Sequence, residues 1–166
     1  RVSDQSTQHI MKNDHAADTE HYRRRLEAFL QERHPRLVHA RQLIETRSRA
    51  AASLYRESVA AGEDTLRAAT RADALLYEGL IFSKFDTLCC LLSIDYPLVP
   101  PDKRRSLALE LEERFAGLFD RYNLDDGIYG REEYRHLLAE LSAVLRLYLE
   151  QHSLLVRRKG RPPHRR

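Results

Sequence analysis

Apolar residues recur at intervals of three and four along most of the chain, which is the periodicity of amphipathic α-helices. Six segments carry this pattern: 18–33, 37–61, one that begins near Asp64, one that begins near Ser83, 102–122 and 131–152. No segment alternates apolar and polar residues between hairpin turns. We therefore expect an all-α fold: a single compact orthogonal or bundle-like domain of about six helices, with flexible termini.

Residue types that begin and end helices lie at the boundaries of these segments. Asp18 or Thr19 can cap the first helix, and Pro35 ends it because the residue before a proline avoids the helical region. Gly62 is the residue type expected just after a helix. The proline-rich stretch 96–101 cannot continue a helix, so it predicts a rigid crossing loop.

The fourth segment is apolar on nearly all sides, which predicts a helix in the centre of the domain. Ser83 with Asp86 three residues later is a variant of the capping box, so we expect the helix to start there. Cys89 and Cys90 are adjacent, and a disulfide between neighbours is strained, which favours two buried, reduced thiols. In the preceding helix, Asp73 lies near the apolar stripe and needs a partner such as an arginine.

Periodicity and charge together divide the chain into three parts: a flexible arm (1–17), which lacks helical periodicity, a helical domain (18–154) and a basic disordered tail (155–166). The net charge is +3, and the tail supplies six cations without an acid, so +3 minus six leaves the rest at −3. Mobile cations can neutralise nucleic-acid phosphates, although such runs also occur as solubilising termini. The candidate nucleic-acid contacts are Arg157, Arg158, Lys159, Arg161, Arg165 and Arg166.

Two features resemble metal sites but fit a structural role better. If Gly127 were the glycine of a calcium loop, Tyr122 and Leu124 would stand where side-chain ligands are needed, so we expect an ordinary turn. Glu133 and His136 match half of a di-iron ligand set, but the second copy is absent. We interpret His136 as part of a solvated ladder with Glu132 and Glu140.

The sequence contains no phosphate-binding loop, nucleophile elbow or zinc-protease motif. We therefore expect no enzyme, no metal and no cofactor. The N-terminal residues lack the apolar stretch of a signal peptide, and charges interrupt the most apolar segment, 75–98. These features predict a cytoplasmic protein without a membrane span.

The stretch from Leu76 to Leu88 resembles the central signature of a small helical family from Bacteroidetes, the DUF1896 type. Supporting similarity lies in 22–35, 48–62, 119–124 and 147–150, so the resemblance spans roughly residues 20–152. It implies an all-α fold and an association with conjugative-transposon gene neighbourhoods. It implies no catalytic residues.

Taken together, the patterns favour a helical accessory module of a mobile-element system that binds another protein, with a homodimer as one arrangement. The alternative is a nucleic-acid-binding accessory protein that uses the basic tail and the arginine-rich first two helices.

Overall fold

The computed structural model describes the backbone of residues 3–159 and the side chains of residues 8, 11, 12 and 14–152. Residues 3–159 form seven α-helices and two short 3-10 helices, and this range contains no strand. The predicted all-α class is therefore confirmed. Where one domain was expected, the contacts group into two compact units, Arg1–Asp86 and Thr87–Arg166, which are described separately.

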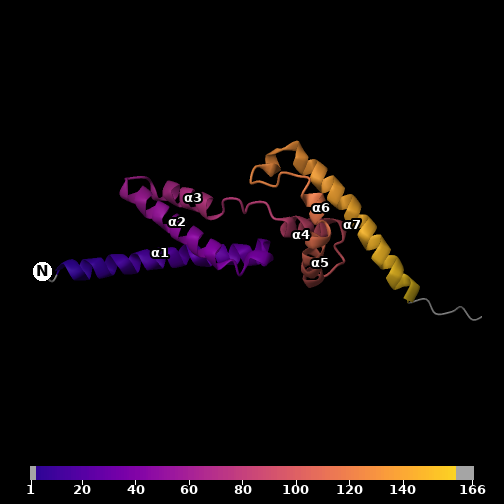
Figure 1. Cartoon of the computed structure of the whole chain (residues 1–166), viewed down its shortest axis with the longest axis horizontal. Helices are drawn as coiled ribbons and strands as arrows, with labels where there is room; N and C mark the ends of the chain where they lie inside the picture. The colour runs from indigo at the N-terminus through magenta and orange to yellow at the C-terminus, as the bar shows by residue number, and fades with distance from the viewer. Residues whose placement is uncertain (1–2, 160–166) are drawn as a thin grey trace, which may run out of the picture. The chain divides into compact units, whose positions relative to one another are not determined.

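The first unit is built on three helices: α1 (Ser3–Arg33), α2 (Arg41–Ala60) and α3 (Thr65–Leu76), with the 3-10 helix η1 (Pro35–Leu37) after α1. Figure 1 shows α2 doubling back along α1 and α3 returning along α2. The helices bury one apolar cluster, whose members are Tyr22, Leu26, Leu30, Ile44, Ala51, Ala52, Ala72, Leu76 and Leu80.

The start of α1 differs from the prediction. The helix begins at Ser3 rather than at Asp18, so residues 3–17 of the predicted flexible arm are helical, and residues 1–2 lie outside the described residues. Adding a residue to an existing helix is much easier than nucleating one, and no glycine or proline interrupts residues 3–18. The described side chains before Asp18 are exposed, so this part of α1 is an extension of the packed segment.

The boundaries of α2 and α3 follow the local signals in the sequence. Gly62 adopts the left-handed conformation (φ +87°) two residues after the end of α2. Asp64 caps α3, because its carboxylate accepts hydrogen bonds from the backbone N–H groups of Leu66 and Arg67 at 3.1 and 3.2 Å. The end of α2 and the start of α3 were predicted, since these signals depend on residues only a few positions apart. The start of α2 was predicted near Leu37 but lies at Arg41, because the 3-10 helix η1 occupies Pro35–Leu37.

The expected partner of Asp73 is Arg25 on α1. Its two guanidinium nitrogens donate to the two carboxylate oxygens of Asp73 at 2.5 and 2.9 Å. The same guanidinium lies 5.9 Å from the ring centroids of Tyr22 and Tyr77. Burial, followed by the charge of Asp73, raises the pKa of Tyr22. This pair joins α1 to α3 at the edge of the apolar cluster.

Ser83 caps the helix α4 (Lys84–Asp95) as predicted. Its Oγ accepts a hydrogen bond from the backbone N–H of Asp86 at 2.9 Å and donates one to the carbonyl oxygen of Arg33. The Arg33 guanidinium also contacts the Asp86 carboxylate at 3.3 Å. The start of α4 is therefore tied to the end of α1 within the first unit.

The second unit contains the rest of α4, then α5 (Pro101–Arg114), α6 (Ala116–Phe119), the 3-10 helix η2 (Ile128–Gly130) and α7 (Glu132–Lys159). The predicted helix 102–122 is interrupted at Phe115 and ends at Phe119, and Gly117 in its middle weakens the helix locally. The buried apolar residues are Leu88, Leu91, Leu92, Ala108, Leu111, Leu118, Phe119, Ile128, Leu137, Leu141, Leu145 and Tyr148.

Tyr148 links α7 to α5. Its hydroxyl donates to the carboxylate of Glu110 at 3.1 Å, and the guanidinium of Arg114 lies 4.9 Å from its ring centroid. Burial, followed by the hydrogen bond to Glu110, raises the pKa of Tyr148.

The cysteine prediction was wrong in part. Cys89 is half-buried and Cys90 is exposed, because successive helical residues point about 100° apart and Leu88, Leu91 and Leu92 occupy the buried face of α4. None of the helices within residues 3–159 is long and apolar enough to cross a membrane.

Candidate functional site

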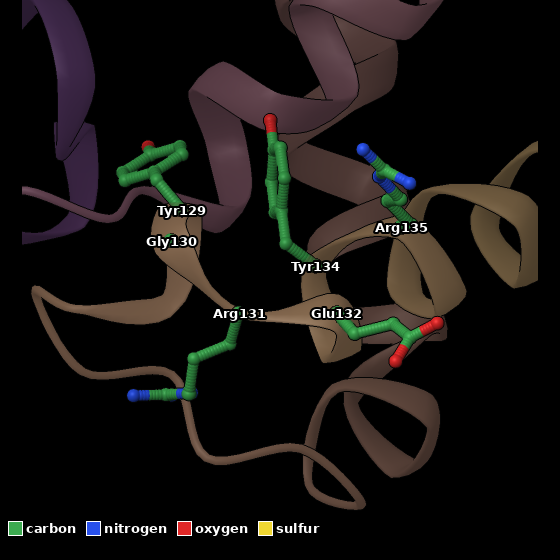
Figure 2. Close-up of a pocket in the computed structure, with 6 residues that line it drawn as sticks. All are labelled: Tyr129, Gly130, Arg131, Glu132, Tyr134 and Arg135. Carbon is green, nitrogen blue, oxygen red and sulfur yellow. The ribbon is translucent and has the colours of Figure 1, made fainter.

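A hollow of about 280 Å³ lies in the second unit at the start of α7. It is lined by a contiguous stretch of chain: Tyr129, Gly130, Arg131, Glu132, Tyr134 and Arg135 (Figure 2). Its most apolar part is the pair Tyr129 and Tyr134, whose ring centroids are 5.0 Å apart with planes at 64°.

The Arg131 side chain forms hydrogen bonds with the turn that precedes α7. Its guanidinium donates to the carboxylate of Asp125 at 2.7 Å and to the carbonyl of Asn123 at 2.6 Å. The hydrogen bond from Arg131, with one from the backbone N–H of Gly127, lowers the pKa of Asp125. Asp125 therefore serves to hold the predicted turn, and its charge is balanced by Arg131.

The charged side chains around the hollow do not converge. Figure 2 shows Arg131, Glu132 and Arg135 pointing in three different directions from the backbone. Catalytic groups act together only when they are aimed at one reacting atom. These residues line a polar hollow in which the charged groups are not aimed at one point.

Among the described residues, the Glu133–His136 motif on α7 is likewise not joined by further metal-ligating side chains. His136 is exposed, and within the described part of the chain no three His, Cys, Asp or Glu side chains are grouped as a metal site. Glu140, which was predicted to form a solvated ladder with His136 and Glu132, has two other partners. Its carboxylate accepts hydrogen bonds from Arg121 at 2.5 Å and from Tyr122 at 2.7 Å. The bond to Glu140 raises the pKa of Tyr122.

Seven arginines of the first unit, part of the set that suggested phosphate binding, contact carboxylates. Arg23 contacts Glu20 and Glu45, Arg56 lies 3.7 Å from Asp18, and Arg71 lies 3.0 Å from Glu63. The arginines in such ion pairs are Arg23, Arg24, Arg25, Arg33, Arg49, Arg56 and Arg71. A phosphate contact made by any of these seven would compete with an existing internal partner.

The six predicted nucleic-acid contacts of the tail fall partly within α7 and partly outside the described residues. Arg157, Arg158 and Lys159 are the last residues of α7, which continues beyond His152 because residues 153–159 contain no glycine or proline. Arg161, Arg165 and Arg166 lie outside the described residues. The structure therefore replaces the first part of the predicted tail, 155–159, with helical backbone.

The most exposed large apolar side chain of the described residues is Leu98, in the turn between α4 and α5. It is 96% exposed, and Ile94, on the last turn of α4, is 74% exposed. This exposure was not predicted, because an apolar residue in an apolar stretch is typical of the core. The prolines on either side of Leu98 were the available signal, since they prevent it from lying on a packed helix.

Comparison with known proteins identifies similar proteins without assigning an activity. Residues 14–154 match the family model described as a domain of unknown function, DUF1896. The crystal structure of protein PG0816 from Porphyromonas gingivalis is similar, with 30% sequence identity and a TM-score of 0.78 over 84% of this chain and 96% of that chain. None of the curated proteins matches the chain. The resemblance stated from the sequence is thereby confirmed.

Proposed function

The chain belongs to the DUF1896 family, and we propose that it works as a helical module that binds another protein. The observation that carries this proposal is the exposure of large apolar side chains in the second unit. Ile94, Leu98 and Leu147 are 74%, 96% and 59% exposed, while Leu88, Leu91 and Leu92 of α4 and Leu137, Leu141 and Leu145 of α7 are buried. Contiguous exposed apolar patches mark contact sites for other proteins, and we propose that these three side chains contribute to such a patch.

The proposed role is that of an accessory protein in a mobile-element system, acting by binding and not by catalysis. The association with conjugative-transposon gene neighbourhoods, which the family resemblance implies, supports the mobile-element context of this proposal. The lack of convergence around the hollow at the start of α7 supports binding over chemistry.

The nucleic-acid alternative has less support. Seven arginines of the first unit already contact carboxylates, which weakens the case for phosphate binding by α1 and α2. What remains is the basic run 157–166. A salt titration of DNA and RNA binding, with and without this run, tests it, because affinity that depends on phosphate contacts falls steeply with salt.

Affinity capture from the native host, combined with light scattering of the purified chain, tests the protein-binding proposal. We expect one partner to be recovered in a fixed ratio, and to be lost when apolar exposed positions are made charged. A strictly monomeric chain that recovers no partner reproducibly would refute the proposal. A mass of twice the chain would identify the partner as a second copy.

A further inference from the structure

We propose that α4 is a coupling element through which the first unit controls the stability of the second. The division between the two units falls inside this helix, directly after Asp86. Its first turn is held by residues of the first unit, and its remaining turns belong to the core of the second. Such coupling does not require the protein-binding role proposed above.

The stretch between α3 and α4 is bound to the first unit and is not a free linker. The guanidinium of Arg47 on α2 donates to the carbonyl oxygens of Leu75 and Glu78 at 3.0 and 2.7 Å. The Nε2 atom of His34 lies at hydrogen-bond distance, 2.7 Å, from the carbonyl oxygen of Leu80. The chain therefore enters α4 in a conformation that α2 and the end of α1 set.

The cap of α4 also depends on the first unit. The Ser83 hydroxyl is buried, accepts the hydrogen bond from the Asp86 N–H and donates to the carbonyl oxygen of Arg33. The guanidinium of Arg33 lies 3.3 Å from the Asp86 carboxylate. The folded end of α1 thus fixes the hydroxyl that caps α4.

The later turns of α4 supply apolar side chains to the second unit. Leu88 and Leu92 are fully buried there, and Leu91 is nearly so. The helix has 12 residues, and isolated helices shorter than about 12–15 residues are marginal in water because nucleation is costly. We infer that α4 needs both the cap in the first unit and the burial in the second.

Helix formation is cooperative, and this joins the two requirements. When the first unit opens, α4 loses its cap, so the core of the second unit loses part of its support. Loss of one cap and one ion pair should raise the equilibrium constant for unfolding the second unit about five- to thirtyfold. An event that displaces the end of α1, at Arg33, therefore changes the stability of the second unit.

Residue-resolved urea unfolding of the full chain tests the coupling, with the amide NMR signals of Ala51 and Leu141 as reporters of the first and second units. Leu26→Ala combined with Leu30→Ala removes two fully buried side chains from α1, so that the first unit unfolds at lower urea than the second. We expect the unfolding constant of the second unit to rise about five- to thirtyfold. Leu66→Ala, at an exposed position of α3, should shift neither signal.

A second comparison tests the route of the coupling. Ser83→Ala removes the cap itself and should weaken the second unit while the first unit is still folded. Added to the two α1 substitutions, Ser83→Ala should have little further effect on the Leu141 signal, because both changes remove the same interaction. Ser93→Ala, exposed on the same helix, should leave that signal unchanged.

Two results would overturn the coupling role of α4. In the first, the second unit keeps its wild-type unfolding constant although the Ala51 signal shows that the first unit is unfolded. In the second, Ser83→Ala adds its full effect to that of the α1 substitutions, which would mean that the first unit acts on the second by another route.

Discussion

Replacing Ser83 with alanine should destabilise the first unit more than an ordinary serine substitution. The hydroxyl is buried (1% exposed), caps α4 through the N–H of Asp86, and donates to the carbonyl of Arg33. Loss of a helix cap costs about 1 kcal/mol. A carbonyl left without its hydrogen bond costs about 1 kcal/mol or more. The two losses together predict a destabilisation of about 2 kcal/mol.

Urea and thermal unfolding, followed by circular dichroism and tyrosine fluorescence, measure this change. For a chain of this size, about 2 kcal/mol corresponds to a fall in Tm of about 4–8 °C. Amide hydrogen exchange adds a local measurement, because the N–H of Asp86 loses its acceptor. We expect its exchange to accelerate about 30-fold if it opens with the unit.

Ser93→Ala is the matched control, since Ser93 is exposed on the same helix. Its free energy of unfolding should stay within about 0.5 kcal/mol of wild type. Ser83→Thr keeps a hydroxyl and should recover part of the loss. If Ser83→Ala were as stable as Ser93→Ala and the Asp86 amide exchanged at the wild-type rate, the assigned role of the Ser83 hydroxyl would be refuted.

Three further predictions follow from the described contacts. In Gly62→Ala the added methyl group meets open space, but the alanine must adopt a positive φ, so the variant should be less stable by about 1 kcal/mol in urea unfolding. An unchanged free energy of unfolding would contradict backbone strain at this position. Phe119→Ala removes a fully buried ring and should cost about 3–5 kcal/mol, against little change for Leu66→Ala. By NMR titration, the pKa of Asp125 should lie below its ordinary value and rise in Arg131→Gln. Because the folded pKa is lowered, the stabilising effect should be present above the unfolded pKa and disappear as the pH falls through the folded one; an unchanged pKa in the variant would exclude Arg131 as the cause.

The sequence predicted those features that depend on neighbouring residues. The helix start near Asp64, the cap at Ser83 and the glycine after α2 involve hydrogen bonds or dihedral angles within a few residues. The fold class followed from the same local periodicity. Even the ion pair of Asp73 was anticipated in kind, because a charge beside an apolar stripe needs a partner, although Arg25 as that partner depends on tertiary packing.

The features that were missed depend on packing or on how far a helix propagates. The beginning of α1 and the end of α7 carry no strong stop signal, so composition alone suggested flexible segments there. The exposure of Cys90 and Leu98 depends on which face of α4 and its following turn other elements cover. Apolarity alone cannot distinguish a buried side chain from an exposed one, and therefore the exposed apolar positions could not be predicted from the sequence.

The alanines of the first unit have a mechanical consequence. Ala51, Ala52 and Ala72 are fully buried in the cluster that α1, α2 and α3 share. An alanine has no side-chain torsion that can rotate to absorb a displacement, so this part of the core has few alternative packings. A shift of α3 against α2 would have to move backbone against backbone. When α3 is displaced, α2 should therefore move with it, because the side chains between them can rearrange little.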